Sequence, residues 1–305
     1  MISNSNNQIE KIVVPFSSSG LINRIRIIQF VSKLPNNITH ITGDITFGNL
    51  LRKNSIITFH DFEFLHRSSG IKKWILTLFW VKLPSRKAKN ITVISQASKS
   101  EFLNFCPKFK DKVSVIHNPL CTMPSIMPIE GFEWSKDYIL HIGTKSNKNL
   151  SRLLEAITGS NYKLVIVGRL SEGQLNLLQQ SKVDFKNVFD LKHSQIAHLY
   201  KNAQLLSFCS TEEGFGLPII EAQSLGCPVL TSNISSMPEV AGNGALLVNP
   251  YKEEEIQKGI NSLMQDTELR NDLIQKGYEN CKRFSPEVIA AQYDQLYQEV
   301  VSEIK

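Results

Sequence analysis

The sequence predicts an α/β protein built from two doubly wound domains. Short apolar runs that suit buried strands alternate with segments of helical spacing, and this βαβα order implies parallel sheets. Charge also divides the chain, because residues 1–120 carry 17 Lys and Arg against 6 Asp and Glu, whereas residues 121–305 carry 17 against 22. Residues 121–136 contain prolines and little periodicity, which is typical of a linker. We therefore expect domains at 1–120 and 137–284, and a final helix at 285–305.

Length and composition fit two such domains in a reducing compartment. The 305 residues are 42% hydrophobic, as in a globular protein. The five cysteines form no C-x-x-C pair and no histidine cluster accompanies them, so a cytosolic protein without structural zinc is expected. Residues 1–10 are polar, unlike a signal peptide, and the longest near-apolar run, 74–81, is shorter than the roughly 20 residues that span a bilayer. The chain is predicted to be cytoplasmic and not to cross a membrane.

The first half is predicted to begin with a strand, a turn and a helix. Residues 12–16 are a short apolar run, and residues 21–34 show helical spacing. The face of this helix expected to meet the core consists of Leu21, Ile22, Ile25, Ile28 and Val31. A Ser/Gly turn between a strand and a helix can hold a phosphate or an acceptor, which makes Ser19 and Gly20 candidates for the acceptor side. Further strands of this half are expected at 38–42, 55–59, 90–95 and 113–116, with a helix at 96–105.

A His-Asp pair follows the strand expected at 55–59. Open α/β sheets place functional groups at the carboxyl ends of their strands. A histidine in that position can orient or deprotonate an acceptor hydroxyl near neutral pH, with a carboxylate beside it. His60 and Asp61 are therefore candidate catalytic residues, although such a dipeptide taken alone is more common in turns.

Residues 71–89 form a basic amphipathic segment. Six Lys and Arg surround a core of aromatic and aliphatic residues within it. Such a segment can lie on an anionic membrane, or it can cover a sheet as a helix that keeps its lysines in water. Both interpretations stay open. No zinc finger, helix-turn-helix or basic-aromatic RNA motif is present, so nucleic acid is not an expected partner.

The second half is predicted to open with a strand at 138–142, the loop from Gly143 to Asn149, and a helix at 150–158. Glycine permits close approach of a ligand to the backbone, and Lys148 supplies a positive charge over that approach. Further strands are expected at 164–167, 188–191, 204–208, 228–231 and 245–248, and residues 196–200 belong to a helix.

The most specific stretch is residues 207–231, which predicts a strand, a glycine-rich turn, a helix and a second strand. Pro218 suits the first helical turn, where its missing N–H costs nothing. The N–H groups of Phe215, Gly216 and Leu217 would then lie at a helix N-terminus that opens at the carboxyl end of a parallel strand. That is a place for a phosphate.

Two carboxylates give this stretch its specificity. Glu213 lies on the turn, and Glu221 follows within the helix after seven intervening residues. A carboxylate beside a bound phosphate would repel it, so these two are expected to accept hydrogen bonds from hydroxyls instead. A nucleotide sugar offers such hydroxyls on its ribose and on its sugar. Taken singly, each glutamate could also be a helix cap or a solvated surface group.

The spacing Glu-x7-Glu with Gly-Phe-Gly-Leu-Pro inside it resembles the donor site of family 4 glycosyltransferases, which have the two-domain GT-B fold. Gly143-Thr with Lys148-Asn-Leu resembles the family's pyrophosphate-binding loop, and Ile-Ile-Thr-Phe-His60-Asp resembles a strand end in its cleft. The resemblance implies two Rossmann-like domains that face a central cleft, with the final helix packing back on the first domain. It also implies retaining transfer of a hexose-type sugar without a metal, and the lack of an Asp-x-Asp motif agrees.

The resemblance implies a role for each matching residue. Glu213 would hold the transferred sugar as a catalytic group, Glu221 would hold the ribose, and His60 would face the acceptor. Contacts to the donor are implied for Gly143, Thr144, Lys148, Asn149, Gly168, Arg169, Leu191, Gly214, Phe215, Gly216, Leu217 and Glu221. No cofactor is implied. The partners would be a nucleotide sugar and a glycan or lipid-linked acceptor of the cell envelope, with the protein peripheral at the inner face of the membrane.

Two features depart from the family's pattern. Many relatives carry Arg just before the loop lysine, where this chain has Asn147, so Arg169 is expected to supply part of that charge. The first domain is also short for the family and has residues 17–20 in place of a glycine-rich loop. Two alternatives therefore stay open, namely a noncatalytic subunit that binds a nucleotide sugar and a nucleotide-sugar epimerase of the same fold.

Overall fold

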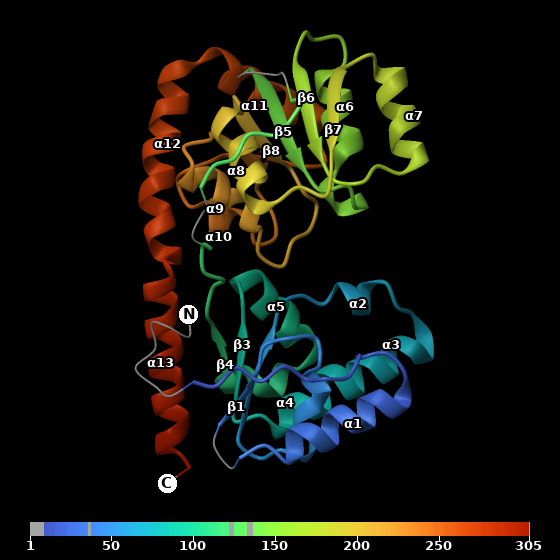
Figure 1. The fold of residues 1–305 in the computed structure, drawn as a ribbon, viewed down its shortest axis with the longest axis vertical. Coiled ribbons are helices and arrows are strands. Elements are labelled where there is room, and N and C mark those ends of the chain that lie inside the picture. Colours follow the sequence, from blue (N-terminus) through green and yellow to red (C-terminus); the bar gives the residue numbers. More distant parts are fainter. Residues whose placement is uncertain (1–8, 36–37, 122–124, 133–136, 305) are drawn as a thin grey trace. The chain divides into compact units, whose positions relative to one another are not determined.

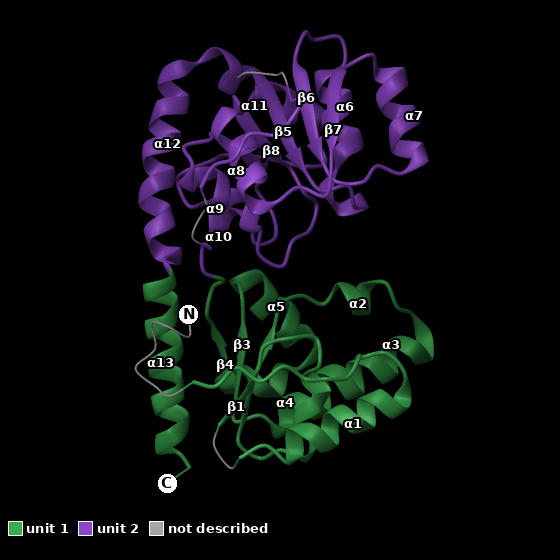
Figure 2. Ribbon diagram, viewed as in Figure 1, with its two compact units in different colours: residues 1–118, 286–305 green, residues 119–285 purple. Residues whose placement is uncertain are grey.

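The computed structural model describes residues 9–35, 38–121, 125–132 and 137–304. It contains two compact units, one of residues 1–118 with 286–305 and one of residues 119–285 (Figure 2). Each unit holds one parallel sheet flanked by helices (Figure 1), which confirms the predicted α/β class in two domains. Parts of the predicted linker, 122–124 and 133–136, lie outside the described residues. Among the described helices, none has the length and apolar character needed to cross a bilayer.

The sheet of unit 1 has four parallel strands in the order β1-β2-β3-β4. These strands are β1 (Thr39–Ile41), β2 (Ser55–Phe59), β3 (Asn90–Val93) and β4 (Val113–Val115). Successive side chains of a strand point to opposite faces of the sheet. Along β2, Ile57 and Phe59 therefore face one hydrophobic core, and Ile56 faces another.

Helices cover both faces of this sheet. The face that contains Ile57 is covered by α1 (Leu21–Ser32), η2 (Thr46–Leu51) and α5 (Gln96–Phe105). It is also covered by one long helix, which consists of α3 (Gly70–Leu76), the π-helix η3 (Thr77–Lys82) and α4 (Leu83–Lys87). On the opposite face, α13 (Pro286–Ser302) packs Ile289 and Leu296 against Ile56. Short helices α2 (Glu63–His66) and η4 (Pro107–Lys112) complete the unit.

One prediction for unit 1 is wrong, and another is right only in part. Residues 12–16 form no strand; Val14 and Phe16 pack on the core as an irregular segment, and Val13 is 73% exposed. Of the predicted core face of α1, Ile28 and Val31 do meet the core, and Val31 faces η2, whose Gly48 leaves room for it. The other three residues, Leu21, Ile22 and Ile25, are exposed, because the N-terminal half of α1 extends past the core.

The sheet of unit 2 has six parallel strands in the order β10-β9-β8-β5-β6-β7. They are β5 (Tyr138–Ile142), β6 (Lys163–Val167), β7 (Asp184–Val188), β8 (Leu205–Phe208), β9 (Val229–Ser232) and β10 (Leu246–Val248). The chain runs outward from β5 to β7 and then returns to β8 on the other side of β5. The carboxyl ends of β5 and β8 therefore flank the topological switch point, where α/β sheets bind ligands.

Among the described residues of unit 2, seven helices flank this sheet. They are α6 (Leu150–Ile157), α7 (Glu172–Ser181), α8 (His193–Asn202), α9 (Leu217–Ser224), α10 (Met237–Ala241), α11 (Glu253–Gln265) and α12 (Thr267–Cys281), with short turns η5 (Ser146–Lys148) and η6 (Lys282–Phe284). The strand predicted at 188–191 is displaced, because β7 covers Asp184–Val188. As an edge strand it is only partly buried and carries polar residues, so its apolar signal is weak.

Candidate functional site

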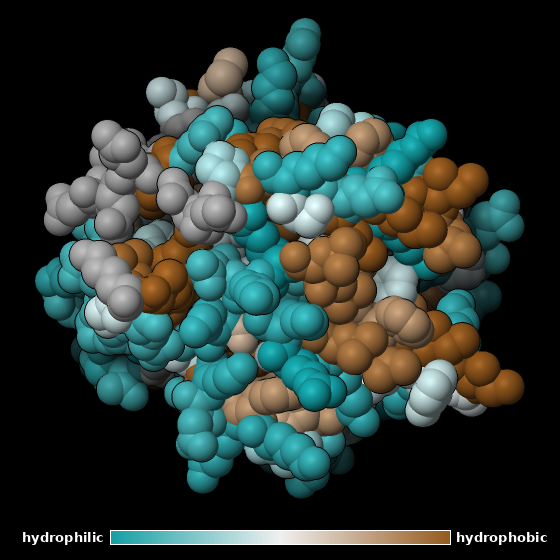
Figure 3. Space-filling view, turned by 90° about the horizontal axis from the view of Figure 1, so that it is seen from below, coloured by the Kyte–Doolittle hydropathy of each residue, from teal (hydrophilic) through white to brown (hydrophobic). Residues whose placement is uncertain are grey.

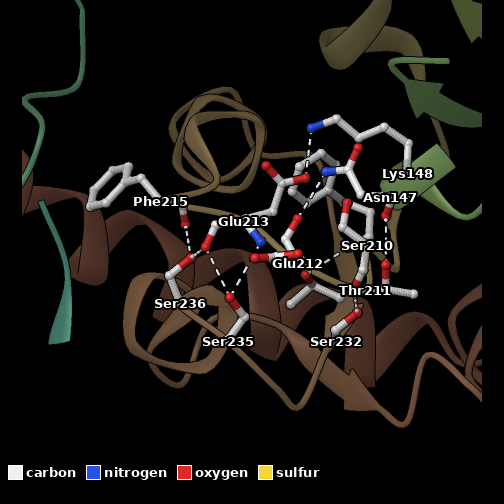
Figure 4. Close-up of polar contacts among 12 residues, drawn as sticks. Asn147, Lys148, Ser210, Thr211, Glu212, Glu213, Phe215, Ser232, Ser235 and Ser236 are labelled. Carbon is white, nitrogen blue, oxygen red and sulfur yellow. Dashed lines mark hydrogen bonds and ion pairs between the residues drawn. The ribbon is translucent and has the colours of Figure 1, made fainter. Parts of the chain in front are cut away.

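Two loops meet at the switch point of the unit 2 sheet. One follows β5 and runs through Gly143 to Asn149, and the other follows β8 and leads to α9. The Thr211 N–H donates to the Asn147 carbonyl at 2.8 Å, and the Asn147 amide Nδ2 donates to the Glu212 carbonyl at 2.9 Å (Figure 4). Asn147 thus ties the two loops together.

Lys148 is held over a glycine. Gly143 has φ +96°, and a Cβ at that position would lie 2.9 Å from both Cγ and Cε of Lys148. The Lys148 Nζ lies 4.7 Å from the centroid of the Phe208 ring and 2.6 Å from the Glu213 carboxylate (Figure 4). Both paired side chains are largely buried, at 17% and 13% exposure. The structure therefore brings together the lysine and the first glutamate predicted for the donor.

Serines after β9 fix the backbone of the loop that carries Glu213. The Ser235 hydroxyl donates to the Glu213 carbonyl at 2.9 Å and accepts from its N–H at 3.2 Å. The buried Ser236 hydroxyl lies 3.0 Å from the Glu213 carbonyl and 2.8 Å from that of Phe215 (Figure 4). Sequence reasoning did not single out these serines, and the only signal for them is a run of small polar residues after a strand.

Helix α9 begins at Leu217, directly after the glycine-rich turn. Gly216 is its N-cap with φ +103°, a conformation that L side chains rarely adopt. Phe215 is 4% exposed, and its ring packs edge-on against that of Phe284 with 5.7 Å between the ring centroids. Phe215 therefore anchors the turn in the core through its side chain, and Gly214 precedes it on the same turn.

Glu221, in the middle of α9, is oriented by helix α8. The Tyr200 hydroxyl donates to the Glu221 carboxylate at 2.8 Å, and His193 Nε2 lies 3.8 Å from its other oxygen. Burial and then the Glu221 charge raise the pKa of Tyr200 well above its ordinary value, so its hydroxyl stays protonated as a donor. Tyr200 is a residue of this site that the sequence did not reveal.

Asn149 and His141 lie beneath the loops. Asn149 is left-handed at φ +63°, is buried, and donates to the carbonyls of Cys209 and Pro250 at 3.0 and 2.7 Å. Its amide is therefore engaged in joining protein segments, so we assign it a structural role here. His141 Nδ1 donates to the Ser207 carbonyl at 3.3 Å. Burial, with the charge of Lys148, lowers the pKa of His141 to about 4, so its ring is neutral at pH 7.

The remaining predicted donor residues surround the carboxyl end of β6. The Thr144 hydroxyl donates to the Arg169 carbonyl at 2.7 Å, and a Cβ at Gly168 would lie 3.0 Å from Thr144 Cγ2. The Arg169 guanidinium pairs with the Asp190 carboxylate and stacks on the Phe189 ring at 4.6 Å. In this structure Arg169 therefore contacts the loop after β7, which also contains half-buried Leu191.

The predicted acceptor-side residues all lie in unit 1. His60 follows β2, and its Nε2 donates to the Thr42 carbonyl at 2.6 Å. The Asp61 carboxylate accepts from the Glu63 N–H two residues later at 3.0 Å, which forms an Asx turn just before the short helix α2. Gly20 is the N-cap of α1 at φ +79°, and the Ser19 hydroxyl pairs with that of Ser17. His60 and Asp61 are thus neighbours at a strand end, as predicted.

Comparison with known proteins gives a family and a fold. The family model of glycosyl transferases group 1 matches residues 123–280. The chain is 29% identical over 226 residues to the O-antigen chain mannosyltransferase RfbU of Salmonella typhimurium, covering 70% of this chain and 62% of that protein. It is 28% identical over 232 residues to O-antigen chain mannosyltransferase B of Escherichia coli, covering 69% and 60%. The chain thus spans about 60% of the length of these relatives.

Solved structures share the fold. Sucrose-phosphate synthase of Thermosynechococcus elongatus matches with a TM-score of 0.75 at 18% identity, over 92% of this chain and 79% of that one. Anabaena HepE, solved with UDP and glucose, matches with a TM-score of 0.72 at 18% identity, over 95% and 84%. These likenesses confirm the predicted GT-B class of fold. The matched family model covers more than half of the residues, and the chain belongs to the group 1 glycosyl transferases.

Proposed function

We propose that this protein moves a hexose-type sugar from a nucleoside-diphosphate sugar to a glycan or lipid-linked acceptor of the cell envelope, with retention of the anomeric configuration. The observation that carries the proposal is the pairing of Lys148 with Glu213 where two loops converge at the switch point of the unit 2 sheet. A cation and a carboxylate at the switch point of a parallel sheet fit the two parts of a nucleotide sugar, its diphosphate and its hydroxyls.

The pairing suggests how the donor is received. A diphosphate near Lys148 would compete with Glu213 for the ammonium group, because both are anions within reach of one cation. The displaced Glu213 carboxylate would then accept a hydrogen bond from a sugar hydroxyl. Glu221, held by Tyr200, would accept from the ribose hydroxyls. The N–H groups at the start of α9 would add further donors to the diphosphate.

The transfer itself exchanges one bond for another. The bond from the anomeric carbon to the diphosphate oxygen breaks, and the nucleoside diphosphate leaves with the electron pair. The acceptor oxygen bonds to the anomeric carbon on the same face, and its proton passes to the departing diphosphate oxygen on that face. Lys148 would stabilise the charge that builds on the leaving diphosphate, which is the work a metal ion performs in other transferases. We therefore propose a reaction without a metal, with His60 and Asp61 on the acceptor side.

The relatives favour a particular donor class. Both curated relatives quoted above are named as mannosyltransferases of O-antigen chains, so mannose is the first sugar to test and a cell-envelope polysaccharide is the first class of acceptor. Since O-antigen chains are polysaccharides of the envelope, a lipid-linked acceptor would place this protein at the cytoplasmic face of a membrane as a peripheral protein.

The first experiment measures thermal stabilisation of the purified protein by UDP, GDP and ADP, beside a Glu221→Ala variant. A ligand that binds only the native state raises the melting temperature according to its concentration relative to its dissociation constant. We expect one nucleoside diphosphate to raise it and the variant to lose the shift. With the corresponding nucleotide sugar and an acceptor extract, transfer should then continue in the presence of EDTA and be abolished in Glu213→Ala.

Other outcomes point to other functions. Stabilisation without any transfer would favour a noncatalytic subunit that binds a nucleotide sugar. Conversion of the nucleotide sugar into an isomer without an acceptor would favour an epimerase. No stabilisation by any of the three nucleotides would overturn the donor site itself, and loss of transfer on adding EDTA would overturn the metal-free reaction.

A further inference from the structure

Unit 1 exposes a group of large apolar side chains from two of its helices. They lie on the N-terminal half of α1 and on the outer side of the long helix 70–87, and their exposure ranges from 41% for Ile75 to 79% for Ile71. We define the α1–α3 face as Leu21, Ile22, Ile25, Ile71, Trp74, Ile75 and Phe79. In Figure 3, hydrophobic residues gather in a broad area on one side of the view. Contiguous apolar areas of this kind mark interaction sites on soluble proteins.

The two helices of the face are joined through the core of unit 1. The Arg24 guanidinium of α1 lies 4.5 Å from the centroid of the Trp80 ring in η3. Trp80 also contacts Phe47 of η2 at 4.9 Å between ring centroids, and η2 packs against α1 through Gly48. Packing therefore fixes the position of the two helices relative to each other.

The burial pattern separates the two interpretations that the sequence left open for residues 71–89. The segment does cover the sheet, because Trp80 and Val81 join the hydrophobic core. A helix that only covered a sheet would be polar on its outer side. Here the outer side instead presents Trp74, Ile75 and Phe79. None of these three side chains belongs to a buried core cluster, so together they present an apolar outer side that suits a further apolar partner.

The charges around the face have one sign. Helix α1, η2 and residues 70–87 together contain seven Lys and Arg and no Asp or Glu. Helix α13, on the opposite face of the same sheet, contains Glu287, Asp294 and Glu299. The cations are therefore concentrated on the apolar side of unit 1. Apolar side chains surrounded by cations complement a surface whose outer layer is anionic and whose interior is hydrocarbon.

A groove on the same helix adds detail to this match. It has a volume of about 310 Å³ and crosses the junction of α3 with the π-helix. Its lining consists of Gly70, Lys73, Trp74, Thr77, Leu78 and Lys82. The two ammonium groups attract a phosphate, and the tryptophan beside them prefers the boundary between lipid headgroups and acyl chains. The groove therefore suits a phosphate that is attached to an apolar group. A phospholipid headgroup has this composition.

We propose that the α1–α3 face docks this protein on a bilayer that contains anionic phospholipids, with lipid phosphates at Lys73 and Lys82. Trp74, Phe79 and Ile22 enter the boundary between headgroups and acyl chains. The inference deepens the proposed function and rests on it for its purpose, since docking brings the protein to a lipid-linked acceptor. Docking itself requires neither the donor nor transfer, so the two proposals fail separately.

The test is sedimentation of the full chain with phosphatidylcholine vesicles, made with and without phosphatidylglycerol. We expect binding only to the anionic vesicles, weakened by added salt. Ile22→Ser with Trp74→Ser should lower the partition coefficient roughly tenfold or more. Its control is Leu175→Ser with Tyr251→Ser, which removes two exposed apolar side chains from unit 2. Lys73→Gln with Lys82→Gln should also weaken binding roughly tenfold, because both lysines line the groove, whereas Lys108→Gln with Lys110→Gln, of equal charge change, should not.

Three outcomes would overturn the proposal. Equal binding to neutral and anionic vesicles would remove the role of charge. Unchanged binding by both α1–α3 variants would place the contact elsewhere. A dimer of the wild type that Ile22→Ser with Trp74→Ser converts to a monomer, without vesicle binding by either, would show that a second copy covers the face. Nucleotide stabilisation measured on every variant reports folding of unit 2 and keeps these outcomes apart from failure of the donor site.

Discussion

Contacts of single side chains keep the charged groups of the candidate site in fixed positions. Lys148 lies between the Phe208 ring and the Glu213 carboxylate, and Glu221 accepts from Tyr200. Each charged group is partly removed from water and has a specific partner in the structure without ligand. The bond from Tyr200 to Glu221 would persist when the ribose binds, so this part of the site is preorganised, whereas Glu213 would exchange its partner Lys148 for a sugar hydroxyl.

Tyr200 allows a test of this idea for Glu221. In Tyr200→Phe the ring stays in its pocket but the hydrogen bond to the carboxylate is lost, which costs about 1.5–3 kcal/mol for a charged partner. We expect the donor KM to rise roughly tenfold, with a smaller change in kcat, since Glu221 would contact the ribose and not the reacting carbon. Tyr162→Phe is the control, because Tyr162 donates a 2.8 Å hydrogen bond to Asn261 elsewhere in unit 2. Equal KM values for both variants would contradict the role.

Gly143 allows a similar test for Lys148. Gly143→Ala would place a methyl group 2.9 Å from the lysine stem and would also strain a backbone at φ +96°. Gly159 has a similar φ of +78° but nothing within 4 Å of its Cβ position. Both variants should therefore lose about 1–2 kcal/mol of unfolding free energy, whereas only Gly143→Ala should lose nucleotide stabilisation and transfer. If Gly159→Ala impairs transfer as strongly, displacement of Lys148 is not the cause.

The residues predicted from sequence are those whose role depends on local chain geometry. The loop Gly143 to Lys148 and the turn before α9 follow from glycines and a lysine at fixed offsets from a strand. Tyr200 and Ser236 were missed because their partners lie 21 and 23 residues away in the chain. Only the packing of α8 and of the segment after β9 brings them to the site.

Among the elements, buried strands were the easiest to predict. β5 and β8 are buried on both faces and appear as continuous apolar runs, so their positions agree with the sequence to within a residue. β7 at the edge of its sheet was displaced, and the apolar run at 12–16 is not a strand. An apolar pattern indicates that a segment contacts a hydrophobic core. Residues 12–16 make such a contact through Val14 and Phe16 without forming hydrogen bonds to a sheet.

Helix α13 provides a test at the level of an element. Leu296 is 4% exposed and packs in the small core that joins α13 to β2, so Leu296→Ala should lower the unfolding free energy by about 2–5 kcal/mol. Val301, on the same helix, is 40% exposed, and Val301→Ala should change it by less than about 0.5 kcal/mol. Urea unfolding measures both. Similar losses in the two variants would show that this core does not hold α13.

At the scale of the whole molecule, the sequence predicted the fold class and the division of charge. Unit 1 carries 18 Lys and Arg against 10 Asp and Glu, and unit 2 carries 16 against 18. The sequence did not reveal that the charges of unit 1 are themselves divided between two faces of its sheet. That division depends on α13, which lies far along the chain from the basic helices yet packs on the same sheet.

Each unit also contains one histidine whose pKa is far below its ordinary value, partly buried His40 in unit 1 and buried His141 in unit 2. In unit 1, loss of contact with water and, to a smaller extent, nearby His60 together lower the pKa of His40 to about 4. The two ring nitrogens of His40 lie 2.8 Å from the Tyr297 hydroxyl and 2.7 Å from that of Thr58. In unit 2, burial is likewise the main reason that the pKa of His141 is about 4.

These two histidines predict how stability depends on pH. In the unfolded chain both titrate near 6.5, so between pH 6.5 and pH 4 the unfolded state binds more protons than the folded state. The unfolding free energy should therefore be highest above pH 6.5 and fall as the pH decreases toward 4, by about 1.4 kcal/mol per pH unit for each histidine. Urea unfolding across this range, for the wild type and for His40→Gln and His141→Gln, measures the slope. Each substitution should lower the slope of unfolding free energy against pH by the contribution of one proton. An unchanged slope in a variant would mean that the histidine it replaces binds its proton equally well in the folded and unfolded states.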